Sequence, residues 1–270
     1  MRIERGTMGL LPYAATGTGR PVVVLAGISP NTGVDSNAFV RTVLSPVLPM
    51  ADHRRLVALN RRRALPQGTT MSDLAAEHAA ALREAFDGPV DVVGVSTGGS
   101  IAQQLAAEHP DVVRRLALIS TGCRLAPRAR AEQAELAALV RAEKVRAAGA
   151  LLATDVVPPW AAPLGRALGW AVAPWILGGR TARADLATTL EAEDEFDLAG
   201  CPAVIAAPTL VVGGARDRFY PADIFAETVE LIPGSTLLTV PRRGHITVAG
   251  DRRARAHVAG FLDFEDSSGA

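Results

Sequence analysis

Unbroken runs of apolar residues recur along the chain. Runs of this length are typical of strands that are buried on both faces of a parallel sheet. They predict strands at residues 21–27, 55–59, 90–95, 113–119, 209–213 and 235–240.

Between these runs, apolar residues recur at helical spacing. In residues 72–86, Leu74, His78 and Leu82 fall on one helical face, and Ser72 is suited to cap the start of the helix. Strands that alternate with helices predict an α/β fold, with a mostly parallel central sheet and helices on both faces. Further helices are predicted at residues 100–108, 221–231 and 248–264.

One long segment interrupts this alternation. Residues 124–203 show no clear strand pattern and are rich in alanine. Helices are predicted there at residues 131–153, 158–177 and 181–193. The chain is therefore expected to form a core domain from residues 1–122 and 204–270, with residues 123–203 inserted between two core strands as a helical cap.

The composition fits one α/β domain with an insertion, and it excludes some partners. Of the 270 residues, 49% are hydrophobic, which is enough for a sizeable core. Lys and Arg number 28, as do Asp and Glu, so the formal net charge is zero. Nucleic acids and anionic membranes select a basic excess. We therefore expect neither as a partner, and we expect a monomer or homodimer that acts on a small molecule.

Cysteine usage and the ends of the chain bear on the compartment. The two cysteines, Cys123 and Cys201, are too few for a disulfide-stapled fold. They lie near the two predicted junctions of core and cap, and we expect free thiols. The N-terminus lacks the continuous apolar segment of a signal peptide, and the apolar stretch 168–177 is too short to span a bilayer. The sequence therefore predicts a cytoplasmic protein.

The first candidate for chemistry is the stretch Gly94-Val95-Ser96-Thr97-Gly98, which follows a predicted strand and precedes a predicted helix. In such a turn the central residue is strained, and the flanking glycines let strand and helix approach closely. The turn would hold the Ser96 hydroxyl at the carboxyl end of the sheet, where a helix N-terminus favours negative charge. This context favours a nucleophile over a turn without chemistry.

A serine hydroxyl becomes a good nucleophile only when an oriented base removes its proton. Asp217 lies in the loop after the predicted strand 209–213, and His245 follows the last predicted strand and a glycine. Both loops therefore belong to the carboxyl edge of the sheet. The order Ser96, Asp217, His245 predicts nucleophile, orienting acid and general base. A solvated carboxylate between two arginines is the alternative interpretation of Asp217.

Other residues fit these roles less well. The loop of residues 120–123, which is the other place for the acid in this arrangement, holds no carboxylate. His53 precedes a strand, so it belongs to the opposite edge of the sheet. The remaining histidines lie in or at the ends of helices, which favours packing or surface positions: His78, His109 and His257.

An oxyanion hole needs two backbone N–H donors beside the nucleophile. The N–H group of Thr97, directly after Ser96, is the first. The second should come from the loop after the predicted strand 21–27, and we assign it to Ile28. In the same loop, Ser29 and Asn31 are candidates for side-chain contacts with a substrate or for shaping the turn.

Together, these features resemble the α/β-hydrolase superfamily. The resemblance covers the element order of nearly the whole chain, and its specific signals are the stretch 94–98, Asp217 and the pair Gly244-His245. Residues 60–62 look like the Asp-x-Arg-Gly loop of the family in altered form. Family members often have His-Gly where this chain has Ala26-Gly27, and that histidine usually supports the loop. The resemblance implies that the helical insertion is a lid over the site.

The predicted pocket has several candidate residues. The insertion holds all of the tryptophans, and their functional interpretation is an apolar substrate pocket. For any single tryptophan, packing within the cap is the favoured alternative. Candidates for substrate binding besides Ser29 are Trp160, Trp170, Trp175, Phe219, Tyr220 and Ile246.

Two runs of charged residues are interpreted as solvated. Residues 191–195 form an acidic run at the end of a predicted helix. The run Arg61-Arg62-Arg63 lies in a predicted loop, where contact with a phosphate or carboxylate is the alternative.

The leading hypothesis is a serine hydrolase that cleaves a small, largely apolar ester or lactone through an acyl-enzyme. This chemistry calls for no metal and no cofactor. Serine at position 96, in place of aspartate, argues against haloalkane dehalogenase or epoxide hydrolase chemistry. Two alternatives stay open, because one fold hosts many reactions. One is a cofactor-free oxygenase, C–C bond hydrolase or biosynthetic cyclase, and the other is a ligand-sensing module with a vestigial triad.

Overall fold

The computed structural model of the protein describes residues 2–30, 33–157, 159–201 and 203–264. The strands are β1 (Glu4–Met8), β2 (Leu11–Thr16), β3 (Pro21–Leu25), β4 (Arg55–Leu59), β5 (Val90–Val95), β6 (Val113–Ile119), β7 (Thr209–Gly214) and β8 (Thr236–Val240). Within the described residues they form one sheet in the order β1-β2-β4-β3-β5-β6-β7-β8. The β1–β2 and β2–β4 pairs are antiparallel, and all other neighbours are parallel.

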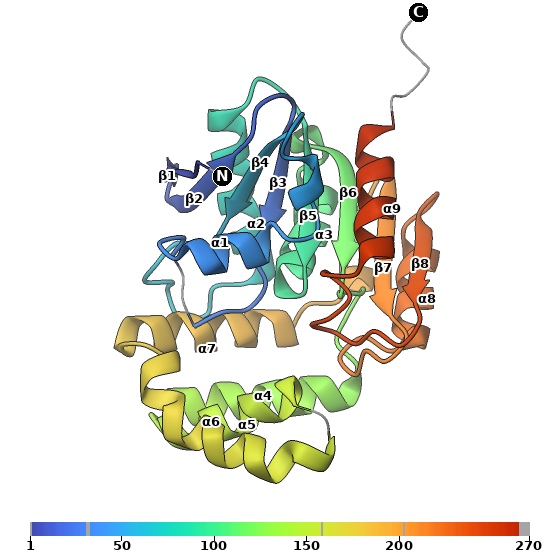
Figure 1. Cartoon of the computed structure of the whole chain (residues 1–270). Coiled ribbons are helices and arrows are strands. Elements are labelled where there is room, and N and C mark those ends of the chain that lie inside the picture. The colour runs from blue at the N-terminus through green and yellow to red at the C-terminus, as the bar shows by residue number, and fades with distance from the viewer. Residues whose placement is uncertain (1, 31–32, 158, 202, 265–270) are drawn as a thin grey trace, which may run out of the picture.

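Helices cover both faces of this sheet (Figure 1). One face is covered by α2 (Met71–Ala85), α3 (Thr97–Glu108) and α8 (Ala222–Leu231), and the other by α1 (Asn37–Val43) and α9 (Arg252–Asp263). Alternate side chains of a strand point to opposite faces, so each apolar run supplies both cores. In β3, Val23 and Leu25 join one core while Val22 and Val24 join the other. The predicted α/β fold with a mostly parallel central sheet is confirmed.

A layer of helices fills the connection between β6 and β7. It comprises α4 (Pro127–Arg141), α5 (Val145–Val156), α6 (Ala162–Ile176) and α7 (Arg180–Asp194), which we call the helical insertion. In Figure 1 it lies below the edge at which the parallel strands end, and it has a small apolar core of its own. In the part of the chain that the structure describes, no helix is long and apolar enough to cross a membrane.

The sequence patterns do not predict β1, β2 or α1, and they merge two helices of the insertion. β1 is an edge strand whose residues are mostly exposed, so it lacks the apolar run of a buried strand. The helix predicted at 131–153 is divided between α4 and α5, because Glu143 has a φ of 54°. A left-handed residue of this kind interrupts a right-handed helix.

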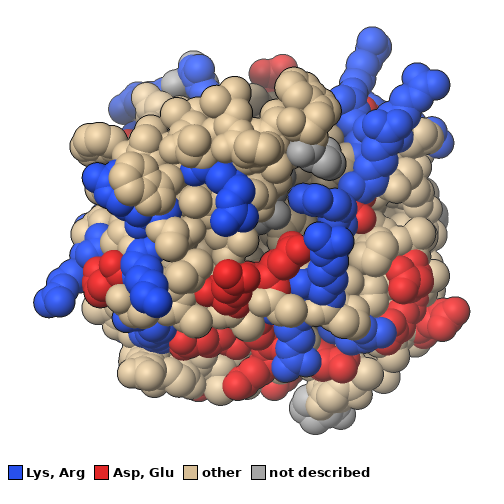
Figure 2. Space-filling view, turned by 90° about the horizontal axis from the view of Figure 1, so that it is seen from below, with Lys and Arg blue, Asp and Glu red and all other residues tan. Residues whose placement is uncertain are grey.

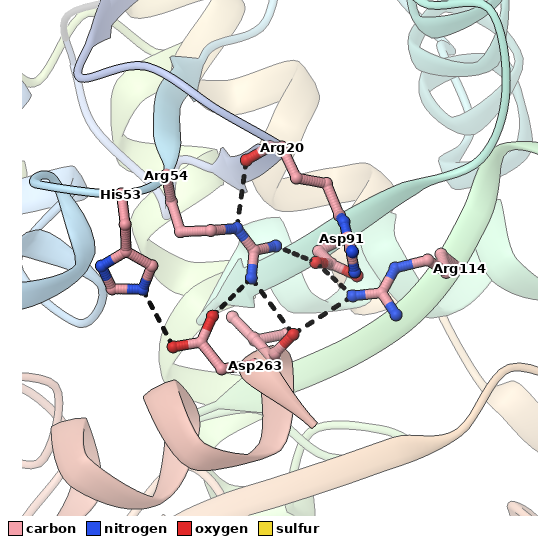
Figure 3. A network of polar contacts seen from close by, with 7 residues as sticks. Arg20, His53, Arg54, Asp91, Arg114 and Asp263 are labelled. Atoms are coloured by element: carbon pink, nitrogen blue, oxygen red, sulfur yellow. Dashed lines mark hydrogen bonds and ion pairs between the residues drawn. The ribbon is translucent and has the colours of Figure 1, made fainter. Parts of the chain in front are cut away.

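At the amino edge of the sheet, a network of charged residues holds α9 in place (Figure 3). Asp91 of β5 is fully buried and accepts hydrogen bonds from Arg54 and, at 2.6 Å, from Arg114 Nη2. Arg54 also donates to the Leu262 carbonyl at 3.2 Å and to the Asp263 carboxylate at 2.6 Å. The network thus joins the end of the last helix to the middle of the sheet.

Candidate active site

Ser96 alone connects β5 to α3, and its backbone is strained. Its φ of 52° is rare for a residue with a side chain. The turn is possible because its flanking glycines allow close packing: a Cβ atom on Gly98 would lie 2.2 Å from the Leu25 carbonyl oxygen, and one on Gly94 would lie 2.7 Å from the Gly98 carbonyl oxygen. The packing of strand against helix therefore holds the Ser96 hydroxyl at the carboxyl edge of the sheet.

The structure brings the predicted nucleophile, base and acid within hydrogen-bond distance of one another. Ser96 Oγ lies 2.9 Å from His245 Nε2, and His245 Nδ1 lies 3.0 Å from Asp217 Oδ2. The Asp217 side chain is fully buried, and its Oδ1 accepts the backbone N–H groups of Phe219 and Tyr220. An acceptor at Nδ1 favours the tautomer that carries its proton there, so Nε2 is left to accept a proton from Ser96.

The His245 ring is fixed from several sides. Its centroid lies 4.7 Å from that of Phe219 and 5.9 Å from that of Tyr220. The backbone carbonyl of His245 accepts the Ser120 hydroxyl at 2.6 Å. These contacts limit rotation of the imidazole away from Ser96.

The loop after β3 lies beside the nucleophile. A Cβ atom on Gly27 would lie 3.0 Å from the Val95 carbonyl oxygen, so the loop and the Ser96 turn approach closely. Ile28 and Thr97, the predicted oxyanion donors, both line the cavity at Ser96. Ser29 is not among the described residues that line this cavity. Asn31 lies outside the described residues.

The side chain of Arg61 supports the loop after β3. The interpretation of Arg61 as part of a solvated run is therefore corrected. Only 1% of its surface is exposed, and it donates to the Ala26 carbonyl at 3.1 Å and the Gly27 carbonyl at 3.2 Å. Burial lowers the pKa of Arg61 to about 10, while the charges of Glu193 and Asp185 oppose the shift. The guanidinium therefore stays charged at neutral pH and braces a loop that lacks the histidine common in the family pattern.

A cavity of about 440 Å³ opens onto Ser96 and His245. Its lining is mostly apolar and comes from the core, including Phe39, and from the helical insertion, including Leu152 of α5. This volume lies within the range of about 300–1,000 Å³ that is typical of small-molecule sites. Three of the predicted pocket residues line it: Phe219, Tyr220 and Ile246.

The tryptophans of the insertion lie elsewhere, so the expectation that they line the pocket is corrected. Trp160, Trp170 and Trp175 are 84%, 52% and 78% exposed, and none is among the described residues of the cavity wall. For Trp170 and Trp175 the reason is that α6 packs against α5 through its small residues, such as Gly169, and directs its larger side chains outward.

Glu193, near the end of α7, is a member of the site that sequence reasoning missed. The acidic run 191–195 is predicted to be solvated, but Glu193 is only 3% exposed and lines the cavity. Burial raises the pKa of the Glu193 carboxyl, and hydrogen bonds oppose the shift. Its carboxylate accepts from four neutral groups: Thr97 Oγ1 at 2.7 Å, Ser100 Oγ at 3.1 Å, Tyr220 OH at 3.2 Å and Gln133 Nε2 at 3.3 Å.

A signal for Glu193 does exist in the sequence. It follows Leu186 by seven residues and Leu190 by three, which places all of them on the buried face of α7.

Within the described residues, no group of three or more His, Cys, Asp or Glu side chains is arranged to hold a metal ion. Cys123 and Cys201 are free thiols, and burial raises the pKa of the Cys123 thiol to about 11.

Known proteins resemble this chain in sequence and fold. The model of the family described as "alpha/beta hydrolase fold" matches residues 51–249. "Putative carbamate hydrolase RutD" of Klebsiella pneumoniae is 28% identical over 190 residues, which cover 67% of this chain and 68% of that protein. "Putative non-heme bromoperoxidase BpoC" of Mycobacterium tuberculosis is 28% identical over 253 residues, covering 87% and 90%. The solved structure of MGS-M2, an alpha/beta hydrolase enzyme from a Medee basin deep-sea metagenome library, matches with a TM-score of 0.76 at 18% identity and covers 95% of each chain.

Proposed function

Because the chain belongs to the α/β hydrolase fold family and is an enzyme of that fold, we propose that it is a serine hydrolase acting on a small, largely apolar ester or lactone. The observation that carries the proposal is the continuous hydrogen-bond relay from Ser96 through His245 to Asp217. A serine, a base and an orienting acid in this geometry form the recurring arrangement for acyl transfer.

In the proposed reaction, His245 Nε2 accepts the Ser96 proton while the serine oxygen attacks the substrate carbonyl carbon. The backbone N–H groups of Thr97 and Ile28 hold the resulting oxyanion. Asp217 keeps Nδ1 protonated and stabilises the imidazolium. The imidazolium then gives its proton to the leaving alkoxide. Water, deprotonated by His245, then attacks the acyl carbon; the bond to Ser96 Oγ breaks, the acid leaves, and His245 returns the proton to Ser96.

The cavity supports the substrate class. Its volume of about 440 Å³ and mostly apolar walls suit a small acyl group. The mostly apolar wall and the buried carboxyl group of Glu193 disfavour a carboxylate on the substrate, because a charge taken out of water without a cationic partner is costly. Leu152 and Gln133 belong to the helical insertion and line the same cavity. This placement supports a cap of residues 123–203 over a core of residues 1–122 and 204–270.

The proposal predicts that Ser96→Ala lowers kcat by on the order of 10⁴- to 10⁶-fold while leaving the fold intact, because the nucleophile is lost. A panel of p-nitrophenyl esters measures turnover, and circular dichroism measures folding. A fluorophosphonate probe followed by peptide mapping should label Ser96 in the wild-type protein. Ser72→Ala is the matched control, because Ser72 lies on the exposed side of α2 and should not affect labelling.

Absence of label on Ser96 would contradict the proposal that Ser96 is the nucleophile. Label on Ser96 without turnover of any ester would contradict its hydrolytic part and favour C–C bond chemistry, another non-hydrolytic reaction or ligand sensing on the same fold.

A further inference from the structure

Four neighbouring strands of the sheet end at the active site. In the order β5-β6-β7-β8, Ser96 follows β5, Asp217 lies in the loop after β7, and His245 lies in the loop after β8. The residue directly after β6, between the strand of the nucleophile and the strand of the acid, is Ser120. It lines the same cavity as Ser96 and His245. Among these four strand ends, only that of β6 has no part in the relay described above.

The backbone of Ser120 is strained. Its φ of 51° is close to the 52° of Ser96 and lies in the left-handed region, which glycine adopts at no steric cost but serine does not. The Ser120 N–H group donates to the Val212 carbonyl of β7 at 3.0 Å, so strand pairing holds the residue in this conformation. A strained residue that is not glycine and lies beside an active site points to a function for its side chain.

The hydroxyl group of Ser120 meets the main chain of the base. Its Oγ donates to the His245 carbonyl oxygen at 2.6 Å. His245 lies within residues 241–251, which form neither helix nor strand. No regular secondary structure fixes the main chain there, so the Ser120 hydroxyl ties the backbone of the base to the end of β6.

The donor of this hydrogen bond is shielded from water. Ser120 is only 1% exposed. The helical insertion follows β6 in the chain and lies across the edge at which the parallel strands end (Figure 1). Figure 2, seen from the side of the insertion, shows side chains covering this face of the molecule. A hydrogen bond in poorly hydrated surroundings is stronger than one in water, so its loss should be felt at His245.

We propose that Ser120 is a positioning residue for the base, and that its hydroxyl holds the His245 main chain so that Nε2 stays at Ser96 Oγ. Ser120 takes no part in bond making and acts through His245. This inference rests on the proposed function, because it assigns Ser120 to the same relay. Nε2 lies 2.9 Å from Ser96 Oγ, and a displacement of about 1 Å at a reacting centre can slow a reaction on the order of a hundredfold. Glycine at position 120 would relieve the strain but would release the base.

Two substitutions separate the hydroxyl group from the strain. Ser120→Ala removes the hydroxyl and keeps the strain, whereas Ser120→Gly removes both. Each should lower kcat by about ten- to a hundredfold and leave KM within about twofold of the wild-type value, because only the base is displaced. Ser120→Gly should nevertheless melt at a higher temperature than Ser120→Ala, since glycine adopts the left-handed conformation freely. Turnover of p-nitrophenyl esters, the rate at which a fluorophosphonate labels Ser96, and thermal denaturation measure these effects.

Ser235→Ala is the matched control. Ser235 directly precedes β8, at the opposite edge of the sheet, and its hydroxyl also donates to a backbone carbonyl, that of Val229 at 3.2 Å. This variant should keep the wild-type kcat and labelling rate.

Several outcomes would overturn the positioning role of Ser120. One is a wild-type kcat and labelling rate in both variants, and another is a raised KM at unchanged kcat, which would make Ser120 a substrate contact. A loss of kcat in Ser120→Ala that Ser120→Gly restores together with its stability would leave Ser120 a purely structural role. A wild-type protein without label on Ser96 would contradict the proposed function itself, and the positioning role with it.

Discussion

Two buried carboxylates at opposite edges of the sheet are held in contrasting ways. Asp91, which is 0% exposed at the amino edge, meets the guanidinium groups of Arg54 and Arg114 (Figure 3). Glu193, which is 3% exposed at the carboxyl edge, accepts hydrogen bonds from hydroxyl groups and an amide. Within the described residues, no Lys or Arg forms an ion pair with Glu193.

The contrast follows from the cost of burying charge. A carboxylate removed from water loses several kcal/mol of solvation unless cations or hydrogen bonds replace it. At the amino edge, Arg54 and Arg114 neutralise Asp91, and the group serves to attach α9. At the carboxyl edge, burial raises the pKa of Glu193, while the nearby His245 opposes the shift. The carboxyl group is therefore stabilised by hydrogen bonds from neutral groups and by the nearby His245, and not by a paired guanidinium.

The largest expected effect is on folding at the amino edge. Asp91→Asn should lower the free energy of unfolding by about 3–5 kcal/mol, because it leaves buried guanidinium groups without an anion. Urea denaturation measures this change, and kcat per folded molecule should stay near the wild-type value. Asp111→Asn is the matched control, since its ion pair with Arg83 is exposed and should matter little. If both variants are equally stable, the network does not hold the fold as we describe.

The second prediction concerns the loss of stability in acid, and it rests on a buried histidine without an ion-pair partner. His78 of α2 is 1% exposed, and burial lowers its pKa to about 4. An unfolded chain binds this proton near pH 6.5. As the pH falls from about 6.5 to about 4, the unfolded state therefore binds a proton that the folded state does not. The free energy of unfolding should decrease over this window by on the order of 3 kcal/mol.

Denaturation at pH 7 and at pH 5 measures this effect. His78→Gln should show a smaller decrease between the two values than the wild type does, because the titrating group is gone. His257→Gln is the control, since His257 is exposed on α9 and should keep the wild-type slope. An unchanged slope in His78→Gln would assign the acid sensitivity to another group.

The smallest effect is expected at Glu193. A carboxyl group whose pKa is raised by folding favours the folded state at low pH and opposes it above its folded pKa. Glu193→Gln should therefore leave the stability at pH 7 unchanged or raise it. It should lower kcat/KM by about tenfold or less and change the acidic limb of the pH profile, since the cavity wall loses a carboxyl group whose pKa is raised by burial.

The pH profile of kcat/KM distinguishes this role from a purely structural one. Glu195→Gln, two residues further on and exposed, should keep the wild-type profile. An acidic limb that stays in place in Glu193→Gln, together with a loss of stability, would make Glu193 resemble Asp91 and would remove the contrast between the two edges.

The sequence by itself determined the order of the elements and the place of the relay. Parallel strands end at one edge of a sheet, so residues that directly follow buried apolar runs must meet there. For this reason Ser96, Asp217 and His245 could be grouped without knowledge of the fold, and the structure brings them within hydrogen-bond distance. The glycines around Ser96 were informative for a similar reason, because the close approach of strand and helix is a local requirement.

Only the tertiary structure decided which charged and apolar side chains turn inward. Glu193 is buried because Thr97 and Tyr220, from distant parts of the chain, donate to it. Arg61 is buried because the carbonyls of the loop after β3 accept from it. Trp170 and Trp175 face outward because α6 meets α5 through small residues. A local pattern specifies an element, but the burial of one side chain depends on partners that the folded chain brings to it.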